Sequence, residues 1–183
     1  WGNIRFDQSF TPDLCRLLAA SGLVAVTGGL EVASDRLLER MQKGVTIEQV
    51  ARVARAFRQA GVMVHAYLMY AFPTQTVQET VDSMEVVRQL FAEEVLSSAF
   101  WHRFVLTRHS GIFPRPESFG IEIVDAPGFA RNDVEHRDPT GGDHDRFEEV
   151  LPRALEAWKR GEELERPVHT WGSGLPETRE APD

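Results

Sequence analysis

The residues of this chain that could do chemistry lie just after its predicted strands. Glu31 follows an apolar and glycine-rich run at 23–29, and His102, Arg103 and His109 lie at or after the end of another apolar run. In sheets of parallel strands, ligands bind at the carboxyl ends of the strands, where side chains from several strands meet. A carboxylate and an imidazole at such an edge could act as acid and base if the fold brought them together.

The elements that must position these residues alternate regularly over the first 106 residues. Helical patterns begin at serine or threonine, the residues that favour helix N-caps, and end at glycine, which favours the position after a helix. Three of the four strand-like runs are mostly apolar, as is typical of parallel strands covered on both faces; the four runs span 3–7, 23–27, 62–70 and 98–106. We therefore expect an α/β fold of parallel βα units, half of a TIM-like partial barrel with about four strands.

Composition excludes several classes of protein. The chain has 183 residues, with 20 lysines and arginines against 28 aspartates and glutamates, and this net charge of −8 lies entirely after residue 120. The acidic balance indicates no nucleic-acid partner, and no apolar run approaches the roughly 18 residues of a membrane helix. The single cysteine, Cys15, excludes an internal disulfide framework and fits a cytoplasmic location.

The periodicity ends after residue 106, which divides the chain into a βα part (1–106) and an acidic, loop-rich extension (107–183). One amphipathic helix is predicted in the extension, over 146–163. About forty irregular residues before it exceed an ordinary loop, so they form either a lid or a solvated appendage. The acids and histidines between 133 and 145 could bind a metal, but their spacing matches no known site, and a solvated loop is the favoured interpretation.

Four short motifs resemble, in their order and spacing, the radical S-adenosylmethionine (radical SAM) enzymes. They are GLEVASD at 29–35, KGVT at 43–46, AGV at 60–62 and FPTQT at 72–76. The resemblance covers roughly residues 3–106 and corresponds to the second half of the partial barrel of that family. The cobalamin-domain-bearing and coproporphyrinogen-dehydrogenase-like branch is the most similar in appearance.

The resemblance implies a cofactor chemistry for which this chain does not supply all of the ligands. The family binds a four-iron four-sulfur cluster through Cys-x-x-x-Cys-x-x-Cys, reduces S-adenosylmethionine with it, and forms a deoxyadenosyl radical that abstracts hydrogen from the substrate. The sequence lacks this motif, and Cys15 alone cannot replace three thiolates. We therefore expect a fragment of a radical SAM oxidoreductase or transferase, inactive without the missing N-terminal half of the barrel. Whether cobalamin is used is left open.

The resemblance also assigns cofactor-binding positions. Glu31 matches a residue that hydrogen-bonds the cofactor, and Lys43 matches a basic residue that meets the methionine carboxylate. Arg5 matches a polar site on the third strand of the barrel, and Tyr67 occupies a position where related enzymes often place an acid for the ribose. Each also has a structural interpretation, because charges at helix ends, a surface ion pair or a core tyrosine need no ligand. Ala71 replaces the usual glycine of the turn that follows Tyr67's strand.

His102, Arg103 and His109 are candidates for a pocket for an unidentified small-molecule substrate, and we assign no catalytic residue or metal ligand. Hydrogen bonding within the fold is their alternative role, and His65 is expected to be a core histidine with a partner. Two other functions stay open. One is a non-catalytic α/β binding or interaction domain, and the other is an unrelated α/β enzyme that uses Glu31 and His102 as acid and base.

Overall fold

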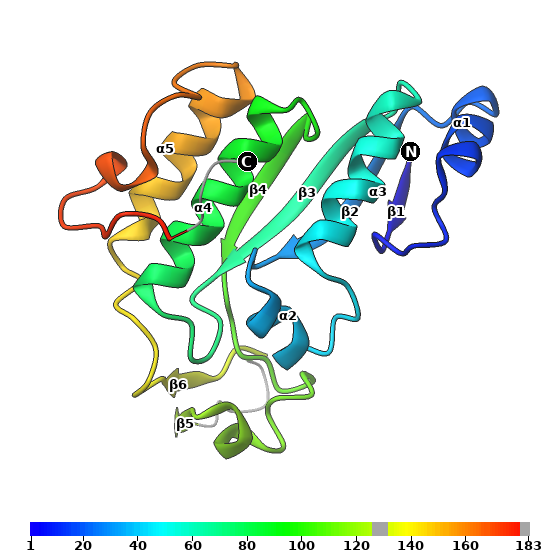
Figure 1. Cartoon of the computed structure of the whole chain (residues 1–183). Helices are drawn as coiled ribbons and strands as arrows, with labels where there is room; N and C mark the ends of the chain where they lie inside the picture. Colours follow the sequence, from blue (N-terminus) through cyan, green and yellow to red (C-terminus); the bar gives the residue numbers. More distant parts are fainter. Residues whose placement is uncertain (126–131, 180–183) are drawn as a thin grey trace.

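The centre of the protein is a four-stranded sheet, seen in a computed structural model that describes residues 1–125 and 132–179. All neighbouring strands are parallel, in the order β1-β2-β3-β4. This confirms the predicted α/β fold of parallel βα units (Figure 1). The strands are β1 (Gly2–Ile4), β2 (Ala25–Glu31), β3 (Met63–Tyr70) and β4 (Ser98–Arg103).

Helices connect the strands, and their ends follow the predicted capping residues. Thr11, Thr46 and Thr76 each accept a backbone N–H of the first turn, and Thr76 with Glu79 forms a complete capping box. No helix in the described ranges has both the length and the apolar character needed to cross a membrane. The helices are α1 (Pro12–Ala20), α2 (Asp35–Arg40), α3 (Ile47–Gln59), α4 (Val77–Ala92) and α5 (Phe147–Lys159).

Two caps that the sequence pattern predicts, Ser34 before α2 and a capping box of Thr46 with Gln49 before α3, differ in detail from the structure. Ser34 precedes α2, but its side chain caps no backbone group of that helix and instead hydrogen-bonds Glu79, 3.4 Å away. Gln49 does not complete a capping box with Thr46, because its amide donates to the carbonyl oxygen of Phe6 at 2.8 Å. In both cases a tertiary contact replaces the local one that the sequence suggested.

The two faces of the sheet differ in what covers them. Val64, Ala66 and Leu68 of β3 are completely buried and belong to one hydrophobic core with α3, α4 and α5. On the opposite face, Tyr67 of β3 and Phe100 of β4 are paired in register and are 45% and 57% exposed. One face is therefore closed by helices, and the other presents exposed aromatic side chains, as expected for the inner face of an incomplete barrel.

The segment after β4 contributes to three hydrophobic clusters, and its Ile112 and Phe119 pack on the one formed by Val32, Leu37 and Phe72. Its hairpin, β5 (Glu122–Asp125) and β6 (Glu135–Arg137), lies beyond the carboxyl ends of the strands, beside the short helix Pro116–Phe119 (Figure 1). Leu106, Ile121 and Val134 form a small core there. Helix α5, by contrast, buries one face in the main core. The acidic extension is thus packed on the βα part at two places.

Gly28 provides a test of the packing between β2 and the residues after β1. A Cβ at this position would lie 2.5 Å from the fully buried ring of Phe6, whereas a Cβ at Gly2 would meet nothing within 4 Å. We predict that Gly28→Ala lowers the free energy of unfolding by about 1–3 kcal/mol because the ring has no space to move. Urea denaturation measures this, with Gly2→Ala as the matched control. Equal stability of the two variants would contradict the packing described.

Candidate functional site

The strongest group of candidate residues lies at the carboxyl end of β2. Glu31 is the last residue of this strand, and its carboxylate forms an ion pair with the Lys43 ammonium. The two side chains are only 13% and 30% exposed. Lys43 lies beyond the end of α2 at Arg40, so its charge does not belong to the last turn of that helix as the sequence suggested. The pair is a half-buried charge pair at the edge where parallel sheets bind ligands.

The backbone around Glu31 directs its side chain to this place. The register with β3 shifts between Gly29 and Glu31, and Glu31 has φ 61°, a left-handed conformation that costs a non-glycine residue roughly 1–2 kcal/mol. Such strain often accompanies functional positions. Gly29 leaves the space that the carboxylate occupies, because a Cβ there would overlap with Glu31 and lie 3.0 Å from Lys43 Nζ.

Arg5 approaches the same corner from the residues after β1. A Cβ at Gly44 would lie 3.7 Å from an Arg5 guanidinium nitrogen, which places that group beside the turn that carries Lys43. Of the four predicted cofactor-binding residues, Glu31 and Lys43 are therefore in contact, and Arg5 lies near the residue that follows Lys43.

Tyr67 lies on the open face of the sheet. It is beside Gly29 in register and 45% exposed, so it is not a core tyrosine. Its ring stands edge-on to His65, with the ring centroids 5.2 Å apart. His65 lies on the same face and is only partly buried, so it is not a core histidine, but it has the expected partner because its Nδ1 is 2.7 Å from Ser98 Oγ. Burial lowers its pKa.

The structure separates the three residues predicted to line a substrate pocket. His102 pairs in register with Met69 and is half-buried on the same side of β4 as Phe100. Arg103 points the opposite way and binds Asp145 at 2.7 Å and Glu148 of α5 at 2.6 Å. His109 is exposed beyond the strand. Among the three, only His102 shares a face with Tyr67.

Glu31 and His102 are poorly placed to act together as acid and base. They lie on β2 and β4 with β3 between them, and two strand spacings separate their backbones by about 10 Å. The Glu31 carboxylate is directed to Lys43 instead.

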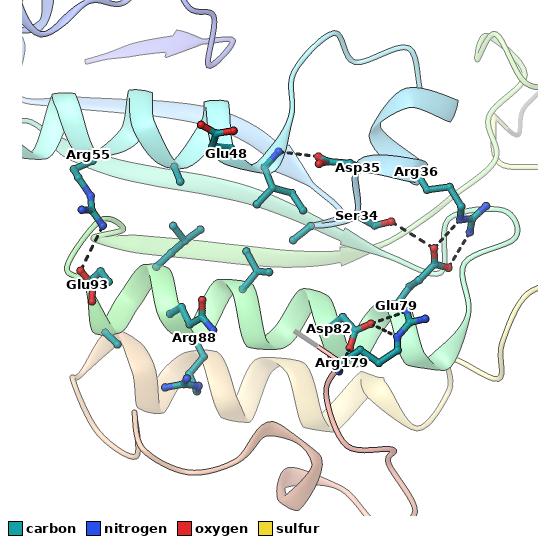
Figure 2. A pocket seen from close by; sticks show the side chains of 17 residues that line it. Ser34, Asp35, Arg36, Glu48, Arg55, Glu79, Asp82, Arg88, Glu93 and Arg179 are labelled. Carbon is teal, nitrogen blue, oxygen red and sulfur yellow. Dashed lines mark hydrogen bonds and ion pairs between the residues drawn. The ribbon is translucent and has the colours of Figure 1, made fainter. Parts of the chain in front are cut away.

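A second group of charged residues, which sequence reasoning did not identify, joins the turn after β3 to α2. Glu79 accepts from Arg36 Nε at 2.7 Å (Figure 2). It also accepts from the backbone N–H of Thr76 at 2.9 Å. Burial raises the pKa of Glu79, but the bonds from Arg36 and Thr76 outweigh it and place the pKa below its usual value. The capping motif indicated Glu79 only as a helix cap. Nothing in the sequence indicated that Arg36, 43 residues earlier, would bind it.

The turn itself (residues 71–76) also contacts the acidic extension. The backbone N–H of Thr74 donates to Asp138 at 2.6 Å, and the carbonyl oxygen of Gln75 accepts from His144 Nε2 at 2.9 Å. Because a carbonyl oxygen only accepts, Nε2 of His144 carries the proton. Asp138 and His144 were expected in a solvated loop, yet His144 is 5% exposed.

A cavity of about 1020 Å³ lies between α3 and α4, and the pair of Arg36 and Glu79 forms part of its wall (Figure 2). None of the predicted cofactor or substrate residues lines it. Six of the charged residues on its walls bind each other, in the pairs Arg36 with Glu79, Arg55 with Glu93 and Arg179 with Asp82. We consider it a groove between helices, because most of its charged groups are already engaged.

Comparison with known proteins supports the family resemblance over part of the chain. Residues 4–87, somewhat less than half of the chain, match the model of the Radical SAM superfamily. The chain is also similar to an uncharacterized protein of Methanopyrus kandleri, with 32% identity over 74 residues. This match covers 39% of the chain but only 14% of the length of that protein. The family match contains Arg5, Glu31, Lys43 and Tyr67, whereas the acidic extension lies outside it.

His144 predicts a dependence of stability on pH. Burial lowers its pKa from 6.5, while the carboxylates of Asp138 and Asp143 oppose this and Arg103 favours it. The unfolded chain then binds the proton more readily, so the free energy of unfolding falls as the pH decreases below about 6.5. We predict that His144→Asn reduces the difference in stability between pH 7 and pH 5, measured by urea denaturation. His65 contributes to the remaining difference in stability, because burial lowers its pKa as well. An unchanged difference would contradict the role given to His144.

Proposed function

We propose that this chain supplies the S-adenosylmethionine-binding edge of a radical SAM enzyme. The observation that carries the proposal is the Glu31–Lys43 pair at the carboxyl end of β2, inside the segment that matches the family. On this proposal the ligands of the iron–sulfur cluster come from outside the chain, as does the other half of the barrel.

The residues of this chain do not fit the iron–sulfur cluster. Its one cysteine, Cys15, is buried in α1 without exposed surface, and a four-iron cluster requires several thiolates. We therefore assign no step of a reaction through the cluster to this chain, and no residue of it is proposed as catalytic.

The residues do fit the methionine part of S-adenosylmethionine, which carries an ammonium and a carboxylate. Glu31 and Lys43 present the two complementary charges side by side, already neutralised by each other. A bound zwitterion would exchange this ion pair for two ion pairs of the same kind, Glu31 with the ammonium and Lys43 with the carboxylate. No unpaired charge would then be buried, which is the condition for placing charges in a half-buried site.

The other proposed roles follow from position. Arg5 adds a positive charge beside Lys43, and Tyr67, next to Gly29 on the open face, is placed for the ribose. His102, on the same face, is proposed to contact a small-molecule substrate, whereas the contacts of Arg103 are with α5. Reductive cleavage of bound S-adenosylmethionine supplies a deoxyadenosyl radical in this family. A cytoplasmic setting, supported by the single cysteine, is part of the proposal, and no residue here argues for cobalamin.

Binding of S-adenosylmethionine to the chain tests the proposal, and Gly29→Ala is a precise probe. The added methyl group would displace the Glu31 carboxylate, which is the flexible end of a side chain, so we expect the chain to stay folded, with the unfolding temperature lowered only by the disturbed ion pair with Lys43. Isothermal titration calorimetry should show affinity weakened about tenfold in Gly29→Ala and in Glu31→Gln, as expected when a charged hydrogen bond is lost. Glu39→Gln, on the exposed side of α2, should bind as the wild type does. Lack of binding by the wild type, or equal affinity in all four proteins, would refute the proposal.

Reaction chemistry provides a second and separate test. We predict that the purified chain, supplied with iron, sulfide and dithionite, forms no deoxyadenosine from S-adenosylmethionine, because it has one cysteine. The gene should encode, before Trp1, three cysteines at the family spacing. Their absence, together with a folded chain that binds no S-adenosylmethionine, would favour a non-catalytic α/β binding domain. Deoxyadenosine formation by the chain alone would show that the cluster ligands were misassigned.

A further inference from the structure

The turn between β3 and α4, residues 71–76, has a backbone conformation that its own residues do not favour. Ala71 has φ 59° and Thr74 has φ 71°, and a left-handed conformation is especially unfavourable for a β-branched residue. Only Phe72 and Gln75 stabilise it from within, through a backbone bond of 2.8 Å and a side-chain bond of 3.1 Å. A conformation of this kind persists when the surrounding structure fixes it from outside.

The acidic extension supplies much of that external support. One oxygen of Asp138 accepts the N–H of Thr74, while the other accepts the N–H groups of Thr140 and Gly141, so a single carboxylate joins the turn to the segment 138–141. Gly142 then donates to the carbonyl oxygen of Gln75 at 2.8 Å.

The approach at Gly142 leaves no space for a side chain, because a Cβ there would lie 2.6 Å from the backbone nitrogen of Val77. His144 completes the contact with its bond to the carbonyl oxygen of Gln75. Backbone groups of two residues of the turn are therefore bound by residues more than sixty positions later in the chain.

A cation from α2 binds the other side of the same turn. Arg36 donates to the carbonyl oxygen of Thr74 at 3.1 Å and to its hydroxyl at 3.3 Å, and it forms the ion pair with Glu79 described above. Thr74 thus has its N–H bound from the extension and its carbonyl oxygen bound from α2. Arg36 belongs to the segment that matches the family, but Asp138 lies outside it.

We propose that Asp138, Gly142 and His144 are positioning residues that set the conformation of the 71–76 turn and thereby the affinity of this sheet edge for S-adenosylmethionine. This inference rests on the proposed function, and it assigns to the acidic extension a role that the family match does not contain. Asp138 is the central positioning residue. When only a fraction of molecules has the binding-competent turn, the apparent Kd rises by the reciprocal of that fraction.

Asp138→Asn isolates the contact with Thr74. The asparagine oxygen can still accept from Thr140 and Gly141, but its NH2 group would then face the N–H of Thr74, and two donors cannot bond. The control is Asp143→Asn, which removes the same charge from the same segment, where the carboxylate binds only Asp145 and Arg146. The amide proton resonance of Thr74 in NMR spectra should shift upfield in Asp138→Asn and stay in place in Asp143→Asn.

Calorimetry with S-adenosylmethionine then tests the functional step. We expect Asp138→Asn to weaken binding about fivefold or more, the range of typical coupling between sites, and Asp143→Asn to leave it unchanged. Adding Thr74→Gly to Asp138→Asn should restore part of the affinity, because glycine adopts the left-handed conformation without strain. Loss of binding through general unfolding would show no such rescue.

The outcomes separate the two proposals. If the wild type binds no S-adenosylmethionine, the proposed function fails and this inference fails with it. If the wild type binds and Asp138→Asn binds equally well despite the shifted Thr74 resonance, the positioning role alone is refuted. Equal weakening by Asp138→Asn and Asp143→Asn would also refute it, because charge and not the contact with Thr74 would then control affinity.

Discussion

The parallel pairing of β3 with both β2 and β4 is the constraint on which the rest of the structure depends. It brings the ends of three strands to one edge, so that Glu31, the turn after Tyr70 and His102 lie along the same edge of the sheet although they are far apart in the sequence. A parallel sheet also requires crossover helices, and these cover one face and leave the other for side chains such as Tyr67. The candidate site is a consequence of this arrangement together with the local backbone at Glu31 and Thr74.

Charge compensation connects this edge to its surroundings. Glu31 with Lys43, and Glu79 with Arg36, are partly buried pairs that would be costly if either member stood alone. The charges of Glu31 and Lys43 could pair with the ammonium and the carboxylate of an amino-acid zwitterion, which is why we connect this pair with ligand binding. The second pair has its hydrogen-bonding capacity used within the fold, by Thr76 and Thr74, which is why we connect it with the shape of the turn.

The fold and part of the site could be predicted from the sequence, because their signals are local. Apolar strands, capping threonines and terminal glycines each act within a few residues, and they predicted the parallel βα units and the place of Glu31 at the carboxyl end of its strand. The bonds of Ser34 and Gln49 could not be foreseen, since each partner comes from a distant part of the chain. The same reason explains Asp138 and His144, whose polar sequence resembles that of a solvated loop. Arg103 was predicted to line a substrate pocket for a different reason, its position at the end of β4. Successive side chains of a strand point to opposite faces, and Arg103 lies on the face that α5 covers.

An NMR titration of the ¹⁵N-labelled chain with S-adenosylmethionine would test the central claim most directly, because it locates the ligand without assuming where it binds. We predict changes in the amide resonances of residues 29–31, 43–44 and 71–76, at the carboxyl edge of the sheet. Changes confined to the groove between α3 and α4, around Arg55 and Glu93, would contradict the account, as would a spectrum unchanged at saturating ligand.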